Sequence, residues 1–109
     1  MKGILMAVYV DHARNPFGRM LMCHMVADGI EELLMISDRI GLARRHFQSG
    51  SFPHSDLSQS YRARAVIAGA VEVDRRGLVA VMRAYRARLI FDPVEAKRLS
   101  GLILTQRGG

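Results

Sequence analysis

A continuous apolar segment near the start of the chain, Ile4 to Val10, ends abruptly in Asp11 and His12. It is rich in strand-forming residues, and its lack of alternation between apolar and polar positions is typical of a strand buried on both faces. We therefore expect a central strand. A carboxylate placed directly after such a strand lies at the edge of a sheet, where polar side chains are free for function.

Four later segments carry the start and stop signals of helices. In the first, Asp28 can cap free backbone N–H groups, Glu31 completes a capping box, and Gly41 provides a left-handed stop. In the last, Asp92 precedes Pro93 at the first helical position. The predicted helices run from Asp28 to Gly41, from near Asp56 or Ser58 to Gly69, from Asp74 to about Arg88, and from Pro93 to about Leu104.

Short segments of strand-forming residues separate these helices. Residues 11–19 are expected to form a loop, because they contain turn formers. Strands that alternate with helices of ten or more residues form βαβ units. We predict one α/β domain over residues 1–109, with two or three layers, a short and mainly parallel sheet, about four helices and a disordered tail at 105–109. The further predicted strands are Met20–Met25, Arg44–Gln48 and Ala70–Val73, and residues 89–91 form either a strand or a loop.

Composition restricts the class of protein. Half of the residues are apolar, as in an ordinary globular domain, and no apolar run approaches the roughly 20 residues that cross a bilayer. The opening segment is better explained as a buried strand than as a secretory signal, because Asp11 and His12 interrupt it. Cys23 is the only cysteine, so no internal disulfide forms, and we expect a cytoplasmic location.

The positive charge is concentrated in the second half of the chain. The formal net charge is +6; residues 1–54 hold six basic and five acidic side chains, whereas residues 55–109 hold ten and five. A basic surface favours a phosphate-bearing or nucleic-acid partner, although a solvated helix face rich in arginine would give the same count. Aromatic residues do not interleave with the arginines, and no glycine-rich phosphate loop is present.

Polar side chains cluster around the predicted ends of the first strands. Asp11 ends the first strand, Gln48 and His54 follow the second, and His24 lies between them, so these side chains could converge at one edge of the sheet. Neutral imidazoles move protons or ligate metals, and carboxylates hold metals or act as bases. The predicted catalytic residues are Asp11, His24 and His54; the predicted ligand-binding residues are Gln48, Asp56, Arg44 and Arg62; and the candidate metal ligands are Asp11, His24, His54 and Asp56.

Each of these residues also has a purely structural interpretation. Asp28 and Asp56 precede predicted helices and can serve as caps. Asp11 can bind the backbone of its own loop, and any single histidine can be buried and bound to a backbone carbonyl. Cys23 adjoins His24, but neighbours in a strand point to opposite faces, so we expect a buried cysteine rather than a nucleophile.

Taken in order, the motifs resemble a small bacterial and phage domain, the domain of unknown function family 4031. The resemblance extends from residue 6 to about residue 83, and the family supplies no activity. It implies that the family's recurring polar set contains Asp11, His24, Asp28, Gln48, His54 and Asp56. The chain departs from the family pattern at His12, where an acidic residue is usual, at His46, where tryptophan is usual, and at Ser55, where tyrosine is usual. The motifs are Tyr9-Val10-Asp11, Cys23-His24-Met25-Val26-Ala27-Asp28, Glu31-Glu32-Leu33, Phe47-Gln48, His54-Ser55-Asp56-Leu57 and Gly69-Ala70-Val71.

Three hypotheses for function follow from the sequence. The first is a domain that binds a small, phosphate-bearing ligand; its enzymatic form is a metal-assisted phosphoester hydrolase with Asp11 as metal ligand or base and Arg44 or Arg62 neutralising the anion. The second is a nucleic-acid-binding accessory protein that uses its arginine-rich second half. The third is a protein-interaction module, without membrane contact, in which the histidines are structural.

Overall fold

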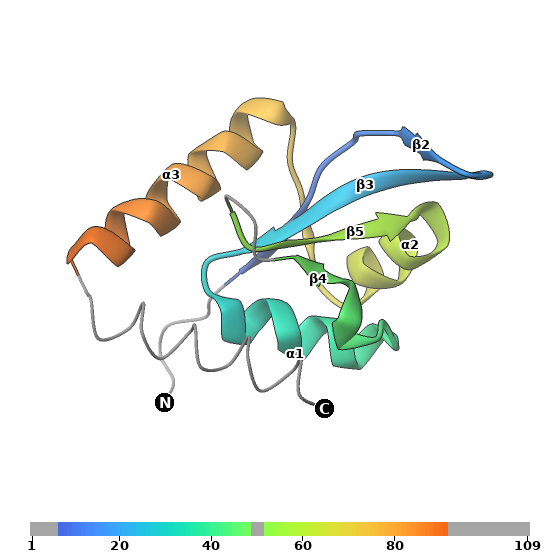
Figure 1. Ribbon diagram of the computed structural model, residues 1–109, viewed down its shortest axis with the longest axis horizontal. Coiled ribbons are helices and arrows are strands. Elements are labelled where there is room, and N and C mark those ends of the chain that lie inside the picture. The colour runs from blue at the N-terminus through green and yellow to red at the C-terminus, as the bar shows by residue number, and fades with distance from the viewer. Residues whose placement is uncertain (1–6, 49–51, 92–109) are drawn as a thin grey trace.

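The structure is a computed structural model that describes residues 7–48 and 52–91 (Figure 1). Residues 4–6 of the predicted first strand, the predicted helix over residues 93–104 and the predicted tail at 105–109 lie outside this part of the chain. In chain order the elements are β1 (Val8–Val10), β2 (Asn15–Phe17), β3 (Met20–Ala27), α1 (Ile30–Ile40), the 3₁₀ turn η1 (Arg44–His46), β4 (Phe47–Gln48), β5 (His54–Ser58), α2 (Gln59–Ile67), β6 (Val71–Glu72) and α3 (Arg75–Phe91).

All six described strands form one sheet, in the order β4-β5-β3-β1-β6, with β2 paired to β3. Within the described ranges only β1 and β6 pair in parallel, and every other pairing is antiparallel. The predicted α/β class is confirmed, but the prediction of a mainly parallel sheet is wrong. The described residues contain three α-helices where about four were predicted, and the fourth falls on residues that are not described.

A hairpin early in the chain accounts for the antiparallel pairing. Residues 11–19, predicted to be a loop, contain β2, and Phe17 pairs with Met20 across a tight turn. Gly18 has φ of +62°, a conformation that glycine adopts without the strain of a Cβ. The chain therefore reverses after β2, and β3 returns antiparallel to β1. The hairpin extends to the right of the other strands in Figure 1.

A second strand lies where the sequence suggested a helix start. Residues 54–58 form β5, in which buried Ser55 and Leu57 alternate with less buried neighbours. Ser58 then caps α2, accepting from the backbone N–H of Tyr61 at 3.5 Å. The start near Ser58 is confirmed, whereas a start at Asp56 is wrong because β5 pairs with β3 there. The predicted strand over 44–48 is shorter than expected, because η1 occupies its first three residues.

The helix ends test the predicted caps. Gly41 ends α1 with φ of +80°, as predicted, and Asp74 Oδ1 accepts from the backbone N–H of Gly77 at 2.8 Å at the start of α3. Asp28, however, is not the N-cap of α1, which is Gly29. Its carboxylate accepts instead from the backbone N–H of Ala7 at 2.9 Å and the Tyr9 hydroxyl at 3.1 Å. Residues 89–91, left open between strand and loop, continue α3.

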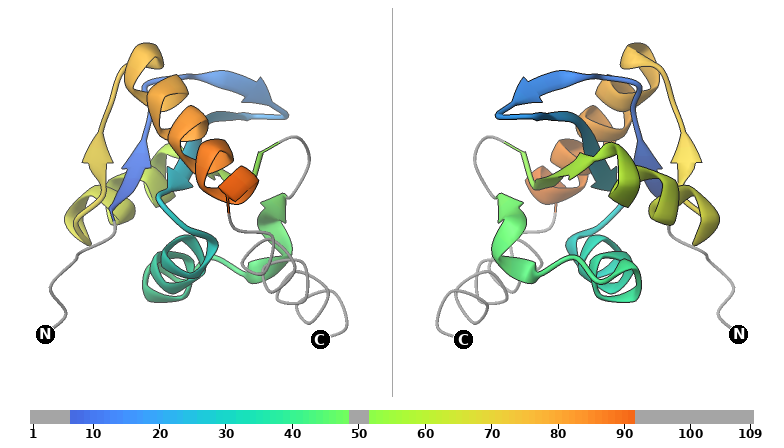
Figure 2. Two further views of the ribbon diagram at one scale, coloured as in Figure 1. Left: turned by 90° about the vertical axis from the view of Figure 1, so that its left-hand side faces the viewer. Right: turned by 90° about the vertical axis from the view of Figure 1, so that its right-hand side faces the viewer.

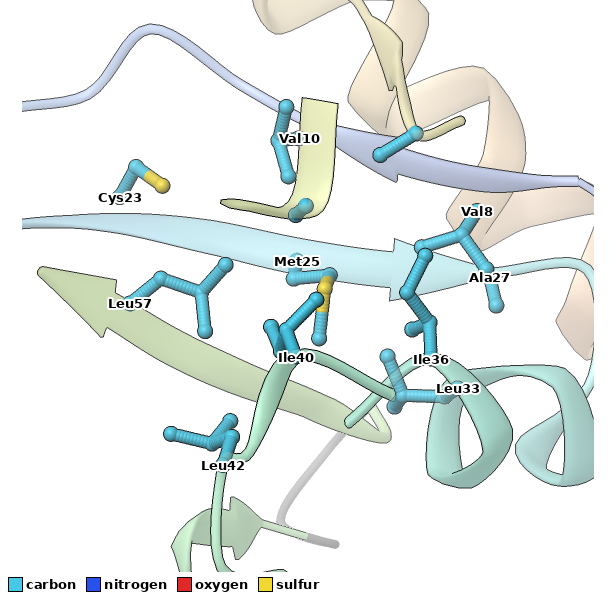
Figure 3. Packing of buried hydrophobic residues seen from close by; sticks show 12 residues of the cluster. Val8, Val10, Cys23, Met25, Ala27, Leu33, Ile36, Ile40, Leu42 and Leu57 are labelled. Atoms are coloured by element: carbon cyan, nitrogen blue, oxygen red, sulfur yellow. The ribbon is translucent and has the colours of Figure 1, made fainter. Parts of the chain in front are cut away.

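Helices cover the two faces of the sheet unequally. We call the face under α1 and α2 the inner face; there Val10, Met25 and Leu57 are fully buried against residues of both helices (Figure 3). On the other, outer face, α3 packs around Val26, where Phe52 and Tyr85 meet edge to face at 5.1 Å between ring centroids. Figure 2 shows α1 and α3 from both ends of the molecule. The outer face remains open beyond Val26, toward the β2–β3 hairpin.

In the part of the chain that the structure describes, no helix is long and apolar enough to cross a bilayer.

Candidate functional site

Ionisable side chains lie side by side on the open part of the outer face. Alternation along β3 sends Cys23 and Met25 into the inner core and His24 to the opposite face. His24 pairs with Asp56 across the β3–β5 ladder, and its carbonyl accepts from the backbone N–H of Asp11 at 3.1 Å. Sheet register, rather than the shared edge of parallel strands, therefore brings these residues together.

Asp11 and His24 form a hydrogen-bonded dyad. One carboxylate oxygen of Asp11 lies 2.7 Å from His24 Nδ1, and the other accepts from the backbone N–H of His24 at 2.8 Å and of Ala13 at 3.3 Å. Burial alone would raise the pKa of Asp11, but these hydrogen bonds and the nearby imidazole charge together hold that pKa below its ordinary value. An ionised carboxylate only accepts, so His24 Nδ1 carries the hydrogen of this bond, and in the neutral form of the ring Nε2 is then a proton acceptor.

The dyad combines a buried carboxylate with a partly exposed imidazole ring. The Asp11 side chain is 9% exposed, whereas the His24 side chain is 35% exposed. A buried carboxylate that fixes the tautomer of a histidine is the arrangement by which proteins make an imidazole a general base. The structural interpretation of Asp11 also holds in part, because its carboxylate accepts from the backbone N–H of Ala13 in the loop that follows β1.

His54, Asp56 and Gln48 extend the polar surface across β5 and β4. The His24 and His54 rings meet edge to face with centroids 6.0 Å apart. His54 Nδ1 donates to the Phe52 carbonyl at 2.8 Å, and its Nε2 lies 3.6 Å from Asp56 Oδ1. Gln48 Nε2 donates to Asp56 Oδ2 at 2.9 Å. Asp56 therefore keeps acceptor capacity on Oδ1.

Arg62 supports the dyad from α2. Its Nε donates to the Asp11 carbonyl at 2.9 Å, and its Nη2 donates to Glu72 Oε1 at 2.9 Å and lies 3.2 Å from His12 Nδ1. The Arg62 side chain is only 16% exposed. Its contacts connect α2 to the residues that follow β1 and to β6, so it holds the backbone of Asp11 in place.

A pocket of about 490 Å³ opens beside the dyad. His24 is in its wall together with residues from the β2–β3 hairpin, η1, β4 and β5. Its volume falls within the range of small-molecule sites. The lining residues are Asn15, Pro16, Phe17, Met22, His24, Arg45, His46, Gln48 and Asp56.

The structure places the sequence-predicted residues in three groups. His24, Gln48 and Asp56 line the pocket, and Asp11, His54 and Arg62 contact residues of its wall or of the dyad. Arg44 lies apart. Its guanidinium binds the Asp38 carboxylate at 2.8 Å on an exposed surface, and this pair holds the pKa of Asp38 below its ordinary value.

Sequence reasoning did not assign several pocket residues to the site. Arg45, adjacent to Arg44, lines the pocket, because the η1 turn sends the two neighbours in different directions. His46, mentioned above only as a departure from the family pattern, also lines the pocket. Asn15 and Phe17 lie in a segment that was predicted to be a loop; the two-residue Gly18-Arg19 turn, with glycine at its first position, is the signal that could have revealed a hairpin.

Cys23 is excluded as a nucleophile in the folded protein. It is 1% exposed in the inner core, opposite to His24. Burial and the nearby Asp11 charge raise the pKa of the Cys23 thiol to about 11, so the reactive thiolate is scarce near neutral pH. The prediction of a buried structural cysteine is confirmed.

The candidate metal ligands predicted from the sequence are Asp11, His24, His54 and Asp56. Among the described side chains, no group of three or more His, Cys, Asp and Glu residues is arranged to hold a metal ion. The Asp11 oxygens are already engaged by the His24 ring and two backbone N–H groups. The four candidate ligands therefore do not form a preorganised metal centre.

Comparison with known proteins assigns the family. A search of curated proteins and a search of solved structures gave no match. The family described as "protein of unknown function (DUF4031)" matches residues 8–85, the region that contains β1 and the dyad and ends within α3. This match covers more than half of the chain, and the resemblance noted from the sequence motifs is confirmed: the chain belongs to the DUF4031 family of proteins of unknown function.

Proposed function

We propose that the pocket binds a small, phosphate-bearing ligand and that His24 serves as the proton acceptor for hydrolysis of its phosphoester bond. The observation that carries this proposal is the dyad: a buried carboxylate orients a reachable imidazole in the wall of a pocket that also contains Arg45. The reducing cytoplasm remains the location that the single, buried Cys23 favours.

Hydrogen-bond donors from the η1 turn give the pocket its preference for an anion. Arg45 has a guanidinium suited to two phosphate oxygens, and His46 adds a second donor from the same η1 turn. Asp56 lies in the pocket too, and its charge would repel a phosphate placed against it. The phosphate is therefore expected at the η1 side, with the Asp56 carboxylate reserved for hydroxyl groups of the ligand.

The reaction follows from the tautomer of His24. Nε2 takes a proton from a water molecule as its oxygen bonds to phosphorus, the ester P–O bond breaks, and the leaving oxygen acquires a proton from solvent. Asp11 stays ionised and stabilises the imidazolium that forms. A divalent cation bound with the substrate would neutralise developing charge, so activity is to be measured with and without Mg²⁺.

Adjacent arginines offer a matched test of the binding step. Arg45→Ala should weaken the binding of ribose 5-phosphate, measured by isothermal titration calorimetry, by about 10-fold or more, because a charge-assisted hydrogen bond contributes about 1.5–3 kcal/mol. Arg44→Ala removes the same charge from a pair with Asp38 outside the pocket and should change the affinity less than about 2-fold. Equal losses in both variants would overturn the proposal.

A second candidate function, nucleic-acid binding, is favoured by a specific surface. Three exposed arginines on α3, Arg75, Arg76 and Arg83, line an open hollow on one side of the helix.

Contacts with three phosphates would give a slope of about −3 for log affinity against log salt, so duplex DNA binding should weaken roughly 40-fold between 50 and 200 mM NaCl. Replacing the three arginines with glutamine should abolish this slope, whereas Arg44→Gln should leave it unchanged. Affinity independent of salt would exclude this function.

A further inference from the structure

We infer that the ligand of the pocket is a nucleotide, with its base stacked on Phe17. This inference rests on the proposed function, since it specifies the phosphate-bearing ligand. It starts from a feature that phosphate binding leaves unexplained: one end of the pocket is apolar and contains Pro16, Phe17 and Met22.

Phe17 is an exposed aromatic residue that does not contribute to either hydrophobic core cluster. Phe17 is 69% exposed although it lines the pocket, and Met20, its partner across the hairpin, is 47% exposed. Alternation along β2 and β3 places Asn15, Phe17 and Met22 on the same face of the hairpin as His24. An aromatic side chain held beside a polar pocket but not buried in the core is suited to stack on a planar ligand.

The remaining walls match the other two parts of a nucleotide. Gln48 commits its amide N–H to Asp56, which leaves the Gln48 carbonyl oxygen and Asp56 Oδ1 as neighbouring acceptors for sugar hydroxyl groups. Arg45 and His46 supply donors for the phosphate. A sugar phosphate alone would use only the polar walls, whereas a nucleoside monophosphate uses the apolar end as well, within the pocket of about 490 Å³.

Two probes separate this inference from the proposed function: adenosine 5′-monophosphate and ribose 5-phosphate. The monophosphate should bind the unmodified protein about 10-fold or more tightly than ribose 5-phosphate, because stacking on one aromatic ring contributes a factor of that size. Phe17→Ala should remove this advantage without changing the affinity for ribose 5-phosphate. Ile67→Ala, which truncates an 86% exposed side chain on α2 that does not line the pocket, is the matched control.

A direct readout of stacking is available because the chain has no tryptophan. Phe17→Trp keeps the aromatic surface, so it should bind adenosine 5′-monophosphate like the unmodified protein, and the fluorescence of the new indole should be quenched on binding. Ribose 5-phosphate should bind this variant without quenching it. If the unmodified protein binds both phosphates equally, the nucleotide inference fails while the phosphate proposal stands; if it binds neither, the phosphate proposal itself fails.

Discussion

Replacing Asp11 with alanine should lower the free energy of unfolding by about 3 kcal/mol, measured by urea denaturation. The substitution leaves two backbone N–H groups and the ring N–H of His24 without their acceptor, and a buried donor stripped of its partner costs about 1–3 kcal/mol. The near-complete burial of Asp11 makes solvent a poor substitute. A loss below about 0.5 kcal/mol would show that the dyad contributes little to the fold.

Asp11→Asn separates the role of Asp11 in the fold from its role in the chemistry. The amide oxygen can still accept from the backbone N–H of His24, so most of the stability should remain. The amide nitrogen replaces the oxygen that faced His24 Nδ1 and donates to that atom, so the ring proton moves to Nε2. Nitrogen-15 NMR should report this change of tautomer, and proton acceptance by Nε2 should be lost. An unchanged tautomer in Asp11→Asn would refute the assigned role of the dyad.

The acid dependence of stability should also change in these variants. The pKa of Asp11 is lower in the folded state than its ordinary value, so its contribution is fully present above the unfolded-state pKa of about 4. The contribution is lost as the pH falls from there through the folded-state pKa. Asp11→Ala should therefore show a shallower loss of stability below about pH 4 than the unmodified protein, in urea denaturation repeated at several pH values.

Leu57→Ala should lower the free energy of unfolding by about 3–4 kcal/mol. Leu57 is fully buried on the inner face of the sheet, and truncating a buried leucine removes its contacts and leaves a cavity. A loss of this size is a large part of the 5–15 kcal/mol that stabilises a typical domain. Ile67→Ala, at an 86% exposed position, should cost less than about 0.5 kcal/mol. Similar losses in the two variants would contradict the packing of β5 against the inner core.

Local signals predicted the helices better than the sheet. Gly41 and Asp74 act through neighbours a few residues away, so their roles could be read from short patterns. The partner of each strand depends on contacts far apart in the sequence, as between His24 and Asp56. A three-residue strand such as β2 has too few positions to show a period, and β5 was obscured by its serines and aspartate.

The proximity of Asp11 and His24 was predicted from the wrong sheet geometry. Asp11 was predicted to be a site residue because it follows a buried strand. Its carboxylate contacts His24 through the antiparallel register of β1 and β3 rather than at the edge of a parallel sheet. The choice between Arg44 and Arg45 could not be made from the sequence. The choice depends on the η1 turn and on Asp38, whose carboxylate forms an ion pair with Arg44.

The alternation along β3 has a consequence for how this chain can change in evolution. One strand supplies both the core, through Cys23 and Met25, and the pocket, through His24. Deleting or inserting a single residue within Met20–Ala27 would exchange these two sets of side chains, placing an imidazole in the hydrophobic interior and a methionine on the pocket wall. Length variation among relatives should therefore be confined to the turns that flank this strand.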